Sequence, residues 1–222
     1  MARILRRSHG QQLDHIGIGV PDTLSGVEKI RTLTGARVDL HDPEPGQWYW
    51  SGSFLLARDS YVEIVGPNPE YQGRQPMHTL TSRLSQPTVL FWYVATDDLK
   101  DLARAASAAG GVVQHIEWIN VEDDDPAYSR YGRAILGPGF IPQKPCLIQW
   151  DRQLRQRADN GVLAECTLVS LELFHPDASA VNPLLAALNI DARIAEGPSR
   201  LRLSLDTPNG RVVFDNPGFD AT

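Results

Sequence analysis

The alternation of hydrophobic and polar positions predicts a strand near the start of the chain and a helix directly after it. Residues 13–20 read Leu-Asp-His-Ile-Gly-Ile-Gly-Val, with apolar side chains at alternate positions, which is typical of a strand. Asp22 stands where a helix N-cap belongs and Gly35 where the helix would end. Between them, apolar residues recur at helical spacing: Leu24, Val27, Ile30 and Leu33. Strand-like runs follow at residues 37–40, 48–56 and 61–65.

The same order recurs in two later parts of the chain. An apolar strand at residues 89–94 precedes a helix capped by Asp97 or Asp98, and strand-like runs follow at residues 112–119, 132–136 and 146–150. In the third part of the chain, a strand at residues 166–174 leads to a helix marked by Val181, Leu184, Leu185 and Leu188. The strands expected after this helix are residues 192–194, 201–205 and 212–214, with Asn209-Gly210 as a hairpin turn between the last two.

This repetition predicts an α+β protein built from βαβββ units. The units are residues 13–69, residues 87–151, and a shorter βαβββ-like unit at residues 165–217. In each unit one helix covers one face of a small, mostly antiparallel sheet, so a second unit or a ligand must cover the other face. We expect the first two units to pair into a cupped sheet of mixed and antiparallel strands.

Composition and charge narrow the class of partner. The 222 residues carry a net charge of −6, which argues against nucleic acid because phosphate binding needs clustered Lys and Arg. No apolar run reaches the roughly 18 residues of a membrane span, and the basic N-terminus lacks the apolar stretch of a signal peptide. Cys146 and Cys166 lie in apolar segments, where reduced, buried thiols are expected. A cytoplasmic protein is the resulting expectation.

Two polar residues interrupt apolar strands and are candidates for chemistry. His15 shares its strand face with Gly17 and Gly19, and glycine there would leave space above the sheet. Glu63 lies in the apolar run 61–65, where an unpaired buried carboxylate would be costly. A structural histidine and a solvent-facing glutamate are the alternatives. We expect His41, His78 and His175, in loop or turn contexts, to be solvated or capping.

The ordered set of motifs resembles the vicinal oxygen chelate superfamily, in particular its glyoxalase-like domain proteins of the glyoxalase, bleomycin resistance and dioxygenase type. The resemblance covers residues 13 to about 217 and rests on four stretches. They are the opening strand and Pro21-Asp22, the run 61–65 followed by Gly-Pro-Asn-Pro, the run Pro-Cys-Leu-Ile-Gln-Trp at residues 145–150, and residues 168–177.

The resemblance implies a divalent metal held by the first and last strands of each paired unit. Carried over by position, His15 and Glu63 are the metal ligands of the first unit and the candidate catalytic residues, and Gln149 would complete the site from the second unit. Zn²⁺, Mn²⁺, Fe²⁺ or Ni²⁺ would suit such ligands. The second unit departs from the pattern, with Val89 or Leu90 and Leu147 at the other ligand positions. The two ligands that match are fewer than the usual three.

Two functions therefore remain open. The first is a metal-dependent enzyme of lyase, isomerase or dioxygenase type that acts on a small oxygenated substrate. The second is a metal-free protein that sequesters or senses a small molecule in an aromatic-lined cup, and an interaction module is a weaker third. In each of the first two, the partner is a small molecule rather than nucleic acid or membrane. We also expect a homodimer, because small sheets leave edges to protect.

Overall fold

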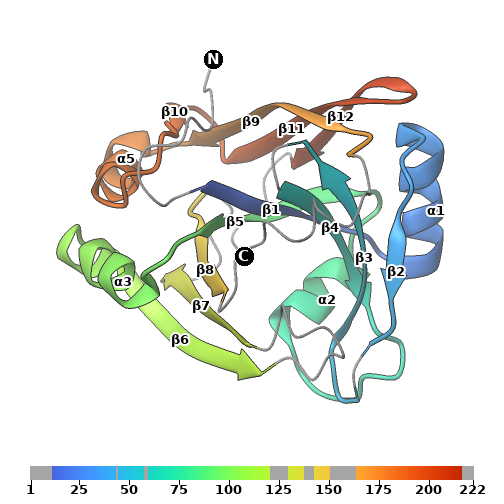
Figure 1. The fold of residues 1–222 in the computed structure, drawn as a ribbon, viewed down its shortest axis with the longest axis horizontal. Helices are drawn as coiled ribbons and strands as arrows, with labels where there is room; N and C mark the ends of the chain where they lie inside the picture. The colour runs from blue at the N-terminus through green and yellow to red at the C-terminus, as the bar shows by residue number, and fades with distance from the viewer. Residues whose placement is uncertain are drawn as a thin grey trace.

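The computed structural model of the chain describes residues 12–43, 45–57, 60–120, 130–137, 143–150 and 164–216. These residues form four helices, together with an eight-stranded and a four-stranded sheet (Figure 1). Both sheets contain parallel and antiparallel pairs. The α+β class that the sequence predicts is confirmed.

The first segment has the predicted order of elements. Its strands and helix are β1 (Gln12–Gly19), α1 (Thr23–Thr34), β2 (Asp39–His41), β3 (Tyr49–Leu56) and β4 (Ser60–Pro67). Asp22 caps α1, because its Oδ1 accepts a hydrogen bond of 2.9 Å from the backbone N–H of Ser25. Gly35 ends the helix at a φ of 71°, a left-handed conformation that favours glycine.

The second segment begins after a short helix that the sequence analysis did not predict. This helix, α2 (Pro76–Ser82), starts with a proline in its first turn, where the missing N–H has no helical partner to lose. The elements that follow are β5 (Thr88–Ala95), α3 (Leu99–Ala108), β6 (Val112–Asn120), β7 (Arg130–Gly137) and β8 (Cys146–Trp150). Asp98 rather than Asp97 caps α3, and accepts from the backbone N–H of Asp101 at 2.9 Å.

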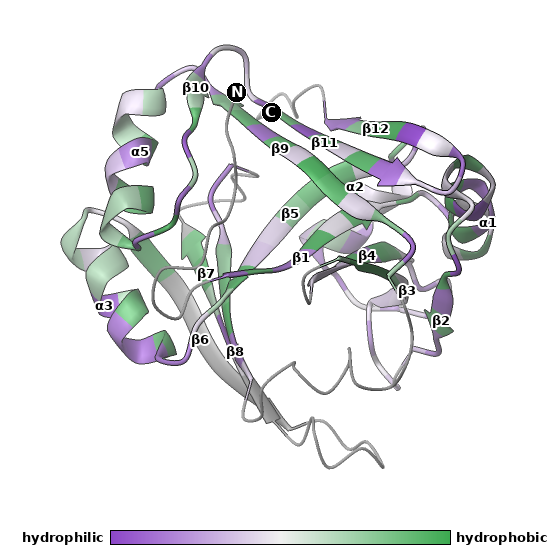
Figure 2. Cartoon of the chain, turned by 45° about the horizontal axis from the view of Figure 1, so that its top comes forward, coloured by the Kyte–Doolittle hydropathy of each residue, from purple (hydrophilic) through white to green (hydrophobic). Residues whose placement is uncertain are grey.

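The third segment repeats the order of elements but not their pairing. It consists of β9 (Thr167–His175), α5 (Ala178–Ala187), β10 (Ala195–Glu196), β11 (Arg200–Thr207) and β12 (Gly210–Asn216). Gly210, at a φ of 98°, forms the predicted turn between the last two strands. Figure 2 shows apolar and polar stretches following one another along β9, whose buried positions are Leu171 and Leu173.

Strand order joins the first two segments into one sheet. The order is β2-β3-β4-β1-β5-β8-β7-β6, in which the parallel pairs β1–β4 and β5–β8 close each segment and the antiparallel pair β1–β5 connects them. The small sheet has the order β10-β9-β11-β12, so its first strand pairs with its second and third strands instead of its last. The domain bounds at 13–69, 87–151 and 165–217 stay a prediction.

The small sheet covers one face of the large one. Apolar side chains of both sheets belong to a single buried cluster, which includes Ile16, Val62, Trp92, Leu171 and Leu203. Hydrogen bonds also join the two: Asn216 Nδ2 donates to the carbonyl of Val89 at 2.7 Å, and Asn209 Nδ2 donates to the carbonyl of Thr32 at 3.0 Å. The third segment thus closes the core over β5 and α1 (Figure 1).

The other face of the large sheet carries the polar residues of interest. A Cβ added to Gly52 on β3 would lie 3.2 Å from Val27 of α1, so Gly52 faces the helix and its neighbour Ser53 faces away from it. Ser53 is paired across the strands with Glu63, and Glu63 with Gly17. We call the face that bears these residues the site face.

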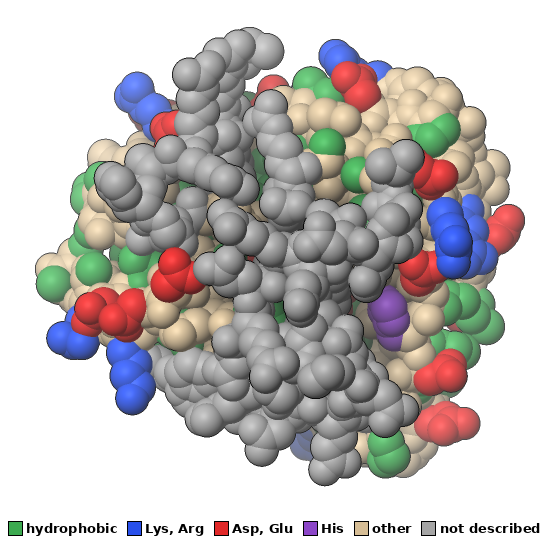
Figure 3. All heavy atoms as spheres, in the orientation of Figure 1, with side chains coloured by type: hydrophobic (Ala, Val, Ile, Leu, Met, Phe, Trp, Pro, Cys, Tyr) green, Lys and Arg blue, Asp and Glu red, His purple; other side chains and the backbone are tan. Residues whose placement is uncertain are grey.

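Charged side chains of both signs lie on the part of the surface that Figure 3 shows. On the face seen in Figure 3, the described Lys and Arg side chains are interspersed with Asp and Glu. Within the part of the chain that the structure describes, no helix is long and apolar enough to cross a membrane.

Candidate functional site

A β-bulge in the first strand sets up the site. The pairing of β1 with β5 passes from Leu13 opposite Val94 to His15 opposite Tyr93, so that Asp14 is an extra residue in β1. A bulge of this kind bends its strand and re-aims side chains. As a result, the side chains of the chain neighbours Asp14 and His15 contact each other directly.

Asp14 is fully buried and both of its carboxylate oxygens are satisfied. Oδ1 lies 2.5 Å from Nδ1 of His15, and Oδ2 accepts a 2.9 Å hydrogen bond from the indole N–H of Trp150 on β8. Because an ionised carboxylate only accepts hydrogen bonds, His15 carries a proton on Nδ1. The other ring nitrogen, Nε2, is left facing the rest of the site.

Glu63 lies at the exposed end of this chain of groups. Its Oε2 is 3.7 Å from Nε2 of His15, and its side chain is 22% exposed where that of His15 is 6% exposed. A separation of 3.7 Å exceeds a hydrogen bond, although catalytic contacts commonly shorten when substrate binds. A ligand above the site face would therefore meet Glu63 before His15.

Burial raises the pKa of the Glu63 carboxyl above its ordinary 4.5. The charge of Asp14 raises it further, whereas Arg133 and the protonated forms of His15 and His41 lower it. The net shift is upward, so Glu63 holds its proton closer to neutral pH than an exposed glutamate does. A carboxyl group with a raised pKa suits general acid–base chemistry.

Aromatic rings fix the orientation of His15. Tyr61 stacks on one side with ring centroids 4.7 Å apart, and Tyr93 stacks at 4.3 Å. Phe91 meets the imidazole edge-on at 6.2 Å. Since rings and carboxylate together hold the imidazole, Nε2 keeps a constant direction toward Glu63.

The second half of the site face, on β5, β8 and β7, carries Tyr93, Cys146 and Arg133. Tyr93 and Cys146 are hydrogen-bonded, and burial raises the pKa of the Cys146 thiol to about 11 and that of Tyr93 well above its ordinary value. The thiol is therefore neutral and a poor nucleophile. Arg133 on β7 shares this face, since it pairs with Ile148 two residues after Cys146, and it lowers the pKa of Cys146.

The structure brings together two of the three residues proposed from the sequence. His15 and Glu63 meet, but Gln149 does not join them. Strand alternation turns Gln149 to the face covered by α3, where its Oε1 accepts a 2.8 Å hydrogen bond from the backbone N–H of Leu99. This amide oxygen caps the helix in place of contacting the site.

The expected space above the glycines of β1 is filled. A Cβ on Gly17 would lie 2.2 Å from the ring of Phe91, and one on Gly19 would lie 2.4 Å from Leu90. The glycines therefore admit neighbouring side chains, which is a packing role, and the sequence interpretation of an open cup above them is wrong.

Sequence reasoning missed the groups that support His15. Asp14 is a charged residue in a buried strand. Because burial of an unpaired charge is costly, its position signals a partner. Its actual partner Trp150 lies 136 residues away in the chain, and no local pattern indicates this pairing. The side chain of His115 and the acidic stretch 122–125 lie outside the described residues.

The donor atoms around His15 decide whether a divalent metal could bind at the site. His15 has the form of a metal ligand, because a carboxylate holds Nδ1 and leaves Nε2 free to coordinate. Yet the described residues contain no group of three or more His, Cys, Asp or Glu side chains able to hold a metal ion, and the cationic Arg133 lies near Glu63. The residues in this part of the chain thus do not fit a three-ligand catalytic metal.

The sequence model of the glyoxalase-like domain family matches residues 13–189, and no curated protein matches the chain. A crystal structure of a hypothetical protein from Staphylococcus aureus aligns with a TM-score of 0.57 at 10% identity, over 92% of this chain and 85% of that one.

Methylmalonyl-CoA epimerases also align, less well. The enzyme from Mycobacterium tuberculosis gives a TM-score of 0.45 at 16% identity, over 71% of this chain and 98% of that one. The Streptomyces coelicolor enzyme in complex with 2-nitronate-propionyl-CoA gives 0.46 at 18% identity, over 63% and 96%. At such identities a structural likeness shows the fold alone.

Proposed function

We propose that this chain, which belongs to the glyoxalase-like domain family of the vicinal oxygen chelate superfamily, is a proton-transfer enzyme of isomerase or lyase type acting on a small oxygenated substrate. One observation carries the proposal. Asp14, His15 and Glu63 lie in a row, 2.5 Å and then 3.7 Å apart, that ends in a partly exposed carboxyl with a raised pKa. That is the arrangement expected of a general base with a fixed support.

In the proposed reaction, Glu63 is the base. Its carboxylate takes a proton from a carbon next to a substrate carbonyl, and the electron pair of the C–H bond moves onto the carbonyl oxygen as an enolate. Return of the proton at a different position gives an isomerisation, and expulsion of a leaving group from the neighbouring carbon gives elimination. Both outcomes share the first step, so this step defines the proposal.

His15 supports Glu63 without needing to touch the substrate. With Nδ1 committed to Asp14, the lone pair on Nε2 can accept a hydrogen bond from protonated Glu63 after the transfer. Asp14 then stabilises any positive charge that develops on the imidazole. His15 and Asp14 are thus positioning residues in this scheme.

Arg133 is a candidate for stabilising the enolate. Its positive charge acts on Glu63, Tyr93 and Cys146, so it lies within electrostatic range of the proposed base. A cation aimed at developing negative charge is among the largest contributions to catalysis in a low-dielectric site.

A metal-free binding protein is the second candidate. The stacking of Tyr61 and Tyr93 on His15, with Phe91 at its edge, favours it, because such a set of rings also suits a flat or apolar ligand. The two candidates differ in one respect: a binding protein would leave the C–H bonds of its ligand intact.

Deuterium exchange distinguishes the two. The protein is incubated in D₂O with separate small carbon acids, including 2-oxo acids, hydroxyketones and thioesters, and ¹H NMR follows loss of the signal next to the carbonyl. We expect wild type to catalyse exchange of at least one compound, and Glu63→Gln to lower that rate by roughly 100-fold or more. Glu28→Gln, which alters an exposed carboxylate on α1, is the matched control. Exchange by none of the compounds, combined with saturable binding of one, would favour the binding protein.

A further inference from the structure

A second polar pair extends the site across the first half of the sheet. Nε2 of His41 on β2 lies 2.9 Å from Oγ of Ser53 on β3. Ser53 is in turn the direct cross-strand partner of Glu63 on β4. His41 pairs with Ser51, which shares the face of Ser53. The three side chains therefore follow one another on the site face over three adjacent strands.

The strand register places Ser53 within reach of Glu63. Residues directly opposite each other in an antiparallel pair have Cβ atoms about 4.5–5.5 Å apart, a gap that a glutamate side chain and a serine hydroxyl can close with one hydrogen bond. Burial raises the pKa of Glu63 and the Asp14 carboxylate adds to this rise, whereas Arg133 and the protonated forms of His15 and His41 lower it. The effect of His41 agrees with its nearness to Glu63.

Exposure to solvent increases in one direction along the polar groups. The His15 side chain is 6% exposed and that of Glu63 is 22% exposed, while His41 lies on the exposed edge strand β2. The Asp14 side of Glu63 thus leads into the protein, and the His41 side leads to water. A carboxyl that gives its proton to solvent instead of returning it to carbon, as in deuterium exchange, can use a route of the second kind.

We propose that Ser53 and His41 form the route by which Glu63 exchanges its proton with solvent. The inference rests on the proposed function, in which Glu63 takes a proton from carbon. Protonated Glu63 gives its proton to Oγ of Ser53, which passes its own hydroxyl proton to the Nε2 lone pair of His41. The imidazolium then releases its Nδ1 proton to water. Ser53 and His41 each end with the proton count they began with, and Glu63 ends ionised. Exchange of the imidazole protons with water then returns His41 to its starting tautomer.

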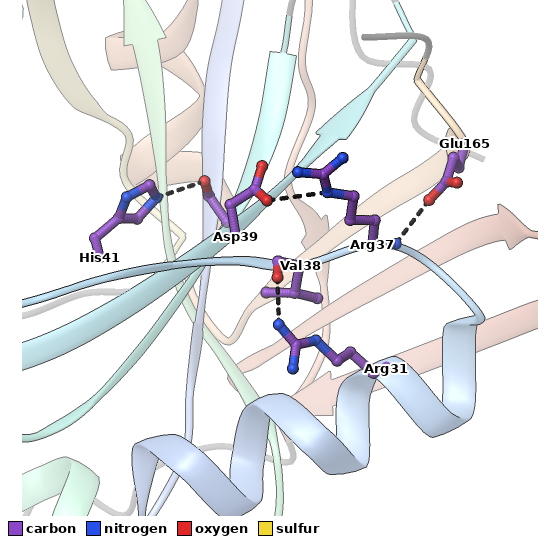
Figure 4. Close-up of polar contacts among 7 residues, drawn as sticks. Arg31, Arg37, Val38, Asp39, His41 and Glu165 are labelled. Carbon is purple, nitrogen blue, oxygen red and sulfur yellow. Dashed lines mark hydrogen bonds and ion pairs between the residues drawn. The ribbon is translucent and has the colours of Figure 1, made fainter.

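Polar contacts along the edge of the sheet hold the residues just before His41. Nε of Arg37 contacts Oδ1 of Asp39 at 3.2 Å, and the backbone N–H of Arg37 donates to Glu165 at 2.7 Å (Figure 4). Arg31 of α1 donates to the carbonyl of Val38. Edge strands of three residues are short, and these contacts give β2 a fixed position from which the imidazole reaches Ser53.

The test uses the carbon acid that wild type exchanges fastest in D₂O. His41→Gln keeps a hydrogen-bonding side chain but cannot carry a proton, and Ser53→Ala removes the link. We expect each to slow deuterium incorporation by about 10-fold to 100-fold, and added imidazole buffer to restore the rate of His41→Gln but not that of Glu63→Gln. His175→Gln, on β9 of the other sheet, is the control and should exchange like wild type.

The outcomes separate the two proposals. Slower exchange in both variants together with imidazole rescue supports the route, because a structural defect would not respond to a small buffer molecule. Wild-type rates in His41→Gln and Ser53→Ala, or a loss that imidazole does not repair, overturn the route and leave Glu63 as the base. Absence of exchange by wild type for every carbon acid overturns both the route and the proposed function.

Discussion

Trp150, the last residue of β8, donates its indole N–H to the carboxylate of Asp14 in β1 at 2.9 Å, across 136 residues of chain. The bond links the two halves of the large sheet at the point where the bulge in β1 turns Asp14 toward His15. Because the same carboxylate holds His15 Nδ1, one buried residue serves both the fold and the site.

Removal of the Asp14 carboxylate should destabilise the protein. Asp14→Ala leaves the N–H groups of His15 and Trp150 without their acceptor, and we expect a loss of about 2–4 kcal/mol in the free energy of unfolding. Trp150→Phe keeps an aromatic ring and removes a single donor, so its cost should be nearer to about 1 kcal/mol. Urea titration followed by circular dichroism measures both. Equal costs for the two variants would contradict this description of Asp14.

Glu63 should make stability depend on pH. Its pKa in the folded protein is above the ordinary value of 4.5, so the folded state binds more protons than the unfolded state between the two pKa values. Stability therefore falls as pH rises from about 4.5 through the folded-state pKa. Glu63→Gln lacks this effect and should gain stability relative to wild type over that range. Unfolding free energies measured from pH 4 to 8 test the sign, and a difference that does not change with pH would refute it.

Gly17 should tolerate a methyl group poorly while Phe91 is present. An alanine Cβ would lie 2.2 Å from the Phe91 ring, so Gly17→Ala should cost about 1–3 kcal/mol. In a Phe91→Ala background the obstacle is gone, and most of that cost should vanish. A double-mutant cycle by chemical denaturation measures the coupling. Additive effects would mean that the ring moves aside freely.

Both cysteines should be unreactive in the folded protein. Burial raises the pKa of Cys146 and of Cys166 to about 11, so at pH 8 roughly one molecule in a thousand carries the thiolate. Ellman's reagent should react slowly with the native chain and quickly with both thiols after unfolding in urea. Rapid reaction of one thiol in the native protein would mean that this thiol is more exposed, or closer to positive charge, than the structure indicates.

The sequence analysis succeeded where the signal was local. Asp22 and Gly35 lie at the two ends of α1 as expected, and Asn209-Gly210 forms the turn between β11 and β12. Caps and turns could be predicted because they depend on neighbouring residues. The sequence analysis missed α2 because its seven residues are too few to show a clear helical period of apolar positions.

The site shows the limit of such reasoning. His15 and Glu63 could be paired by comparing the first and last strands of one segment, and the structure places them 3.7 Å apart. Gln149 required knowing which face of β8 meets α3, and the Asp14–Trp150 bond required knowing the strand order between segments. Both depend on long-range register, which is set by packing and leaves no pattern in either strand alone.

Deuterium exchange by protein treated with EDTA tests most directly whether Asp14, His15 and Glu63 form an acid–base site that works without a metal. We predict that chelation leaves the exchange rate of wild type unchanged. We also predict that the rate rises with pH as Glu63 ionises, with a midpoint above 4.5, and that Glu63→Gln abolishes it. Loss of exchange on chelation, with recovery on adding Zn²⁺, Mn²⁺, Fe²⁺ or Ni²⁺, would contradict the proposal and make His15 and Glu63 metal ligands.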